Sequence, residues 1–204
     1  MKKTNNKGFS LVELIIVIAI MAILAGAIAP ALIRYIDKSR KSNDVSSAKT
    51  IKTAVETALG NESIYELLAT EGSVITFTPG EATEDGDAAT STAITVDAQY
   101  KGKDGKINGK EIDDVKATAE SEIGTNIGEK VPKLKYKKAL DKKDKDSTPE
   151  IYEAYISTKG TVYVFIAHKK VDFKNFTDGD PDVGVTVKDG KIYQISPYMC
   201  DEYQ

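Results

Sequence analysis

The sequence predicts an α+β protein in which one long N-terminal helix packs on an antiparallel β-sheet of about four strands. Three observations lead to this prediction. An uncharged apolar run covers residues 14–33, an apolar stripe with helical spacing follows it to residue 59, and the last part of the chain alternates β-branched and aromatic runs with turn dipeptides. At 204 residues, the chain has room for one domain and an N-terminal extension.

The apolar run is long enough to cross a membrane. It contains eleven Leu, Ile or Val residues and no charged residue, and its twenty residues would measure roughly 30 Å as a helix, the thickness of a bilayer's hydrocarbon core. Lys2, Lys3 and Lys7 precede the run, with no acidic residue among the first eight positions. The positive-inside rule therefore predicts a cytoplasmic N-terminus and an extracellular remainder.

Two simpler interpretations of this N-terminus fit less well. A secretory signal peptide would have a shorter apolar region, whereas this run continues past both candidate cleavage sites, Ala25-Gly26-Ala27 and Ala27-Ile28-Ala29. A plain membrane anchor fits the length but gives Glu13 no role, because an unpaired carboxylate in such a segment costs about 3 kcal/mol. Glu13 therefore needs a partner.

The segment Lys7-Gly8-Phe9-Ser10-Leu11-Val12-Glu13-Leu14 resembles the class III signal of type IV prepilins and the related pseudopilins. In that family a membrane peptidase cleaves after the glycine and methylates the new N-terminal residue. The resemblance implies a leader peptide of residues 1–8, cleavage between Gly8 and Phe9, methylation of Phe9, and Glu13 as the fifth mature residue. A positive amine best satisfies Glu13 in lipid or in a helix bundle, and the Phe9 amine of a neighbouring subunit is the candidate.

Residues 9–33 are expected to form a transmembrane or filament-core helix, which residues 34–60 continue as an amphipathic helix. Pro30 lacks an N–H and frees the carbonyl of Gly26, so we expect a weak point at residues 26–30, with two helices separated at Pro30 as the alternative. The continuation carries an apolar face that can lie on a sheet, made of Val45, Ala48, Ile51, Val55 and Ala58 or Leu59.

The head, residues 60–204, is expected to be loop-rich over residues 60–135 and strand-rich over residues 136–204. In the first part we expect short helices at residues 63–70 and 112–123, a strand at residues 74–78 and an exposed loop at residues 79–93.

In the second part, two hairpins are expected to supply the four strands. One joins residues 151–157 and 161–167 around Lys159-Gly160, and the other joins residues 184–188 and 191–195 around Asp189-Gly190. The charged run at residues 137–146 is expected to be a solvated loop. The C-terminal tail is expected to be held by the packing of Tyr198, Met199 and Tyr203.

The composition excludes most catalytic chemistries. One cysteine, Cys200, and one histidine, His168, allow neither an intramolecular disulfide nor the usual zinc sites, and no nucleophile, base and orienting group cluster in the sequence. We therefore predict no enzyme and no cofactor. Three alternating aspartates are the one candidate set of metal ligands, although a polar turn accounts for them more simply: Asp178, Asp180 and Asp182.

With the resemblance, these observations predict a structural subunit of an extracellular type IV pilus, a PilA-like major pilin of the Gram-positive type. The resemblance implies adhesion, aggregation, biofilm formation and twitching motility. It implies identical subunits, the prepilin peptidase and the pilus assembly platform as partners, and the cytoplasmic membrane as the site of the precursor. A net charge of −3 predicts no specific nucleic-acid partner. The alternatives are a pseudopilin of a type II secretion or DNA-uptake apparatus and a membrane-anchored binding domain that does not polymerise.

Overall fold

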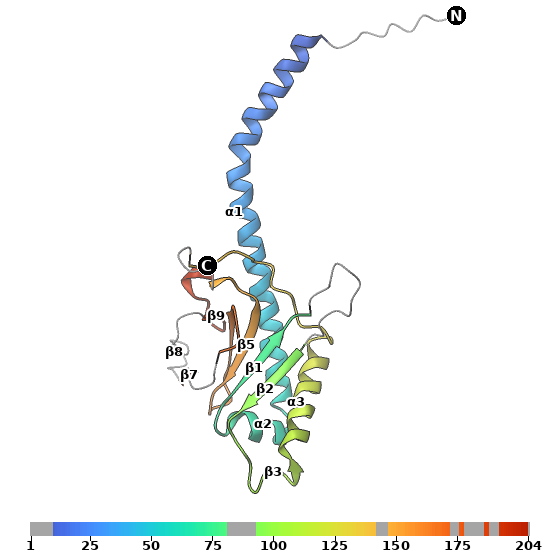
Figure 1. The fold of residues 1–204 in the computed structure, drawn as a ribbon, viewed down its shortest axis with the longest axis vertical. Coiled ribbons are helices and arrows are strands. Elements are labelled where there is room, and N and C mark those ends of the chain that lie inside the picture. Colours follow the sequence, from blue (N-terminus) through green and yellow to red (C-terminus); the bar gives the residue numbers. More distant parts are fainter. Residues whose placement is uncertain are drawn as a thin grey trace, which may run out of the picture. The chain divides into compact units, whose positions relative to one another are not determined.

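The computed structural model describes residues 10–80, 93–141, 147–171, 176–177, 186–187 and 192–203. The chain divides into two compact units, residues 1–39 and residues 40–204. The longest element, helix α1 (Leu11–Ala58), has 48 residues and is continuous through Pro30 (Figure 1). The prediction of one long helix is confirmed, and the alternative of two helices separated at Pro30 is not observed.

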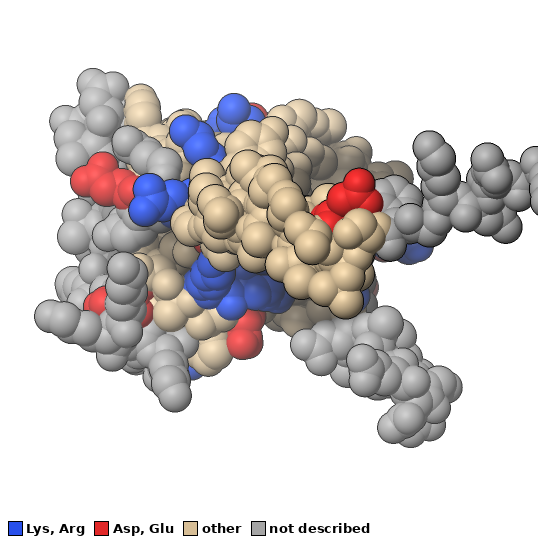
Figure 2. Space-filling model, turned by 90° about the horizontal axis from the view of Figure 1, so that it is seen from above, with Lys and Arg blue, Asp and Glu red and all other residues tan. Residues whose placement is uncertain are grey.

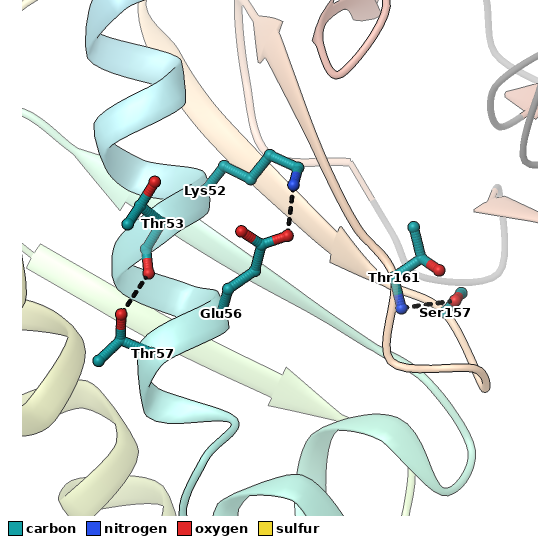
Figure 3. Close-up of polar contacts among 6 residues, drawn as sticks. All are labelled: Lys52, Thr53, Glu56, Thr57, Ser157 and Thr161. Atoms are coloured by element: carbon teal, nitrogen blue, oxygen red, sulfur yellow. Dashed lines mark hydrogen bonds and ion pairs between the residues drawn. The ribbon is translucent and has the colours of Figure 1, made fainter.

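The second half of α1 supplies one side of the hydrophobic core. Ala48, Ile51, Val55 and Ala58 are at most 1% exposed, which confirms the stripe predicted from their spacing. The solvent-facing side of the same segment is polar: Lys52 and Glu56 form an ion pair one helical turn apart, and the Thr57 hydroxyl donates 2.7 Å to the Thr53 carbonyl (Figure 3). This half of α1 is therefore held by burial of one face, not by its intrinsic helix propensity.

A five-stranded antiparallel sheet packs against this helix. Its strand order is β2-β1-β5-β6-β9. The ranges are β1 (Ser73–Thr78), β2 (Ala93–Ala98), β5 (Ile151–Ile156), β6 (Val162–Ala167) and β9 (Ile192–Ser196). The main core includes Ile75, Ala154 and Val164, which are paired across β1, β5 and β6, and the opposite face buries a smaller cluster of Val74, Tyr155, Tyr163 and Phe165. Both faces of the central strands are thus covered.

The helices α2 (Glu62–Ala69) and α3 (Ile112–Asn126) complete the core. Asn61 is the N-cap of α2, and its side chain accepts a 3.1 Å hydrogen bond from the Ser63 N–H. Between β2 and α3, the short strands β3 (Lys106–Ile107) and β4 (Lys110–Glu111) pair around Asn108-Gly109, both of which have positive φ. The predicted helices at residues 63–70 and 112–123 are confirmed within a few residues.

The first predicted hairpin is confirmed and the second is wrong. Strands β5 and β6 join through Ser157–Thr161, where Gly160 has a φ of 75° and the Thr161 N–H donates 3.1 Å to the Ser157 hydroxyl (Figure 3). The second hairpin would pair residues 184–188 with 191–195. Instead, β8 (Thr186–Val187) pairs with β7 (Phe176–Thr177), while β9 pairs with β6. Pairing with the edge of β6 lets β9 bury Ile195. The Asp189-Gly190 turn signal is local and carries no information about this long-range burial.

Two further expectations need correction. The sheet has five strands where about four were expected: it includes β1, which confirms the strand predicted at residues 74–78, and also β2, which was not predicted, while β8 belongs to a separate pair. Of the three tail residues expected to pack, only Tyr203 is buried, at 2% exposure within the short 3₁₀ helix η3 (Asp201–Tyr203), whereas Tyr198 and Met199 are 48% and 39% exposed. Tyr203 is therefore the buried anchor of the tail, and the Cys200 N–H also donates a hydrogen bond to the Gln194 carbonyl of β9 (2.9 Å).

Candidate functional site

The first half of α1 presents apolar side chains to its surroundings on all sides. The exposed large apolar residues between Leu11 and Ile33 each have a relative solvent accessibility of at least 49%. An 18-residue window of α1 has a mean hydropathy of 2.9, so by length and composition this helix can cross a membrane. A continuous apolar surface of this kind needs lipid or another protein to cover it.

The start of α1 forms a capping box. The Ser10 hydroxyl accepts a 3.3 Å bond from the Val12 N–H, and Glu13 Oε2 accepts a 2.9 Å bond from the Ser10 N–H. The reciprocal pattern satisfies backbone donors that have no partner inside the helix. The sequence interpretation missed this role of Glu13, although the Ser-x-x-Glu spacing that signals a capping box is present at residues 10–13.

The other predicted site residues of the N-terminus divide into two groups. Gly8 and Phe9, the predicted cleavage and methylation site, lie outside the described residues, so the structure does not place the Glu13 pairing with Phe9. Gly26 and Pro30 lie inside α1, in helical conformation, and the space around Gly26 where a Cβ would stand is open. The weak point at residues 26–30 stays a prediction.

The predicted metal ligands Asp178, Asp180 and Asp182 lie outside the described residues. Within the described ranges, no three side chains of His, Cys, Asp or Glu come together as a metal site. His168 follows β6, where its Nδ1 lies 3.1 Å from the Thr148 carbonyl oxygen and 3.3 Å from Glu150 Oε1. This arrangement holds the end of a strand.

Two buried carboxylates were not anticipated from the sequence. Asp44 of α1 is fully buried and accepts bonds from the Lys135 N–H (2.6 Å), the Tyr136 N–H (3.0 Å) and the Tyr203 hydroxyl (2.6 Å). Its burial raises the pKa of this carboxyl, and the three hydrogen bonds act against that rise. One carboxylate thus joins α1, the segment after α3 and the C-terminus.

The second buried carboxylate, Glu153, lies on the opposite face of the sheet, in β5. Its Oε1 accepts bonds from the Val171 N–H (2.9 Å) and the Thr76 hydroxyl (3.4 Å), while Oε2 is buried and receives no hydrogen bond from the described residues. Burial raises the pKa of Glu153 to about 7, and the hydrogen bonds and the charge of Lys170 oppose the rise. Glu153 fastens the chain after β6 to the sheet.

These features define a class of protein: an α+β head domain carried on an N-terminal helix whose first half has the length and composition of a membrane span. Comparison with protein families matches residues 3–29 to the prokaryotic N-terminal methylation motif. Over 100 residues the chain is 39% identical to the type IV major fimbrial protein FimA of Dichelobacter nodosus, a match that covers 46% of this chain and 63% of that protein.

Two other relatives match over shorter stretches. The fimbrial protein Q of Moraxella bovis is 51% identical over 54 residues, and the type IV major pilin protein PilA of Myxococcus xanthus is 34% identical over 67 residues. These matches cover 26% and 33% of this chain, and 34% and 30% of the relatives. No solved structure matches the chain. The chain thus spans between about a third and about two thirds of the length of these relatives.

The comparisons thus show an N-terminal methylation motif at residues 3–29 and similarity to proteins named as type IV pilins and fimbrial proteins. The relatives are named as fimbrial proteins and pilins, in agreement with the expectation of a structural protein and not an enzyme. The expected PilA-like subtype of Gram-positive type is not confirmed.

Proposed function

We propose that this chain is a structural subunit of an extracellular type IV pilus and that it polymerises through its N-terminal helix. The observation that carries the proposal is the N-terminal methylation motif at residues 3–29, which leads directly into a helix with an exposed apolar surface. In a filament, that surface is covered by the same helix of other subunits. Adhesion, aggregation, biofilm formation and twitching motility are the functions such a filament serves.

Within this proposal, Glu13 has two roles. In the single chain it caps α1 through Oε2. A carboxylate accepts bonds on both oxygens, so it can also receive the Phe9 amine of a neighbouring subunit once cleavage has exposed that amine. A charged pair of this kind would orient each incoming subunit, because an unpaired charge in an apolar bundle is costly.

The proposed topology places residues 1–8 in the cytoplasm and the head outside. Basic residues flank the apolar run on both sides, since Arg34, Lys38 and Arg40 follow it. The difference in basic residues between the two sides of the apolar run is therefore a weak guide to orientation. The proposed orientation depends more on the methylation motif, because its processing enzyme acts at the start of the chain. The prepilin peptidase would act at Gly8 and Phe9, and the assembly platform would then move the mature subunit from the membrane into the filament.

The test is electron microscopy of sheared surface material from cells that have or lack this chain, combined with antibodies against the head. We expect labelled filaments that disappear on deletion and return with the wild-type gene. The contrary result has two parts: the mature subunit stays in the membrane, and the surface filaments are unlabelled and survive deletion. This result would contradict the proposal and favour an anchored protein that does not build a pilus.

A further inference from the structure

The segment that follows α3 carries an unusual concentration of exposed lysines. Val131 and Leu134 point into the core, at 4% and 2% exposure, and they leave Lys133, Lys135, Lys137 and Lys138 on the surface. In Figure 1 this yellow-to-orange segment leaves α3 and passes α1. Together with Arg40 and Lys41 of α1, these four lysines form a surface that we call the basic collar.

Contacts between backbone and side chain hold the collar together. The Asp44 carboxylate receives the N–H groups of Lys135 and Tyr136, and Lys41 Nζ lies 5.2 Å from the centre of the Tyr136 ring. The charge of Lys137 acts on Asp44 from the same segment. The buried Asp44 carboxylate offsets one of the six positive charges of the collar, which leaves an excess of basic side chains. The collar is thus a positive surface fixed to the side of α1.

The collar stands out against the rest of the chain. Residues 34–44 and 130–138 contain nine of the 28 basic residues and only two acidic ones, Asp37 and Asp44. The leader peptide holds three more basic residues. The remainder of the chain is left with 16 basic residues against 29 acidic ones. Basic side chains occur in several groups on the face seen from above in Figure 2. After residue 8, the excess of basic over acidic residues in this acidic chain therefore lies in residues 34–44 and 130–138.

The α1 residues of the collar follow soon after the apolar run in the sequence. Arg40 comes seven residues after Ile33, and Asp44, which holds the lysine segment, comes eleven residues after it, so the rises along a helix are about 10 and 16 Å. The polar headgroup region on one side of a bilayer is about 5 to 8 Å thick. The positive-inside rule does not account for these charges, because in the proposed topology they lie on the exterior side. Measured along α1, the collar therefore lies within about one Debye length of the headgroup layer, close enough for electrostatic attraction.

We propose that the basic collar binds the anionic phospholipid headgroups of the outer leaflet while the subunit waits in the membrane for assembly. This inference rests on the proposed function, in which the apolar half of α1 spans the membrane. Lysines and arginines near an anionic surface each contribute roughly fivefold to binding, and the contribution falls with salt. The collar would hold the head against the bilayer and release it when the subunit enters a filament.

The head provides an internal control in the hairpin β3–β4. Lys103, Lys106 and Lys110 are exposed there, and Asn108 of the same hairpin donates 3.2 Å to the Ser63 hydroxyl of α2, beyond the C-terminal end of α1. From Asp44 to Ala58, α1 rises about 21 Å. These hairpin lysines therefore lie too far from the collar to reach the same bilayer surface.

The experiment uses the full chain in lipid nanodiscs made of phosphatidylcholine, with or without about a third of phosphatidylglycerol. A small uncharged reagent acetylates the lysines, and mass spectrometry gives the rate at each one. We expect Lys133, Lys135 and Lys137 to react at least about threefold more slowly in the anionic discs, and this protection to disappear in about 1 M salt. Lys103, Lys106 and Lys110 should react equally in both kinds of disc.

A matched pair of variants separates charge from structure. The triple variant K133Q/K135Q/K137Q should abolish the protection that remains measurable at Lys138, whereas K103Q/K106Q/K110Q should leave it intact. Equal rates in the two kinds of disc would overturn the proposal while leaving the membrane helix in place. Failure of the chain to enter the discs would overturn the membrane role as well. Protection found in assembled filaments and absent from anionic discs would assign the collar to contacts between subunits instead.

Discussion

The Tyr203 hydroxyl, one residue before the C-terminal end, donates a 2.6 Å hydrogen bond to the Asp44 carboxylate on α1, 159 positions earlier in the chain. The Tyr203 ring also meets the Tyr136 ring edge-on, with 6.0 Å between the ring centres. Burial and the Asp44 carboxylate raise the pKa of Tyr203, so its hydroxyl keeps its proton and acts as donor. The tail is therefore fixed to the helix by a hydrogen bond to a charged group.

Tyr203→Phe should lower the stability of the head by about 2 kcal/mol, because Asp44 would lose a hydrogen-bond donor in a site that water does not reach. Thermal unfolding of the chain in detergent should show a melting temperature lower by about 5 °C. Tyr198→Phe is the control, since Tyr198 is half exposed, and it should change the melting temperature little. A Tyr203→Phe protein as stable as wild type would mean that packing alone holds the tail.

Glu153 should make the stability of the head depend on pH. Its pKa is about 7 in the folded chain, compared with an ordinary value of 4.5, so the folded chain keeps the proton that the unfolded chain releases. Stability should therefore decrease as the pH rises from about 4.5 to about 7 and stay level above that, a difference of about 3 kcal/mol. Denaturant unfolding at several pH values measures this slope.

Glu153→Gln should flatten that slope and make the head more stable than wild type at pH 8, because an amide carries no charge into the buried site. Glu71→Gln, which changes an exposed side chain, is the matched control and should leave the slope unchanged. The same pH dependence in wild type and Glu153→Gln would show that another group, such as Asp44, causes it.

Processing should remove the first eight residues. The intact mass of the mature chain should correspond to a start at Phe9 with one added methyl group, and three lysines would be lost, which leaves 25 basic side chains against 31 acidic ones. Gly8→Val should leave uncleaved precursor in the membrane, because a branched side chain would obstruct the scissile bond. A mature chain that begins at Met1, or near Ala27, would contradict the prediction.

Glu13→Ala should leave cleavage and membrane insertion intact but abolish filaments. Loss of the carboxylate would leave a neighbour's Phe9 amine unpaired in an apolar bundle, at a cost of about 3 to 5 kcal/mol, which lowers each addition step by more than about a hundredfold. A shear assay for filaments, with a membrane blot for mature subunit, measures both outcomes.

Ser10→Ala separates this pairing from helix capping. It removes the hydroxyl that caps Val12 and keeps the Glu13 carboxylate, so the helix start should lose about 1 kcal/mol while filaments still form. If Ser10→Ala cells lost filaments as completely as Glu13→Ala cells, capping and not pairing would be the essential role of Glu13.

Features that depend on local pattern could be predicted from the order of the amino acids. Helix α1 was predicted from two such patterns, the uninterrupted apolar run and the stripe that includes Ile51 and Val55. The β5–β6 hairpin was predicted from the turn around Lys159-Gly160. The Lys7–Leu14 motif likewise predicted the N-terminal segment that the comparisons confirm. Spacing and residue type suffice for such features, because neighbours in the chain are neighbours in space.

Which distant segments meet could not be predicted from local pattern. Three features depend on contacts between residues far apart in the chain: the pairing of β9 with β6, the position of β2 at the sheet edge, and the burial of Asp44 and Glu153. A turn signal at Asp189-Gly190 could not show that the edge of β6 offered Ile195 a better burial. Asp44 lies in a charged, polar stretch of α1, and only the approach of Tyr136 and Tyr203 makes its site buried. Long-range packing sets these outcomes, since the free energy of burial depends on the whole core.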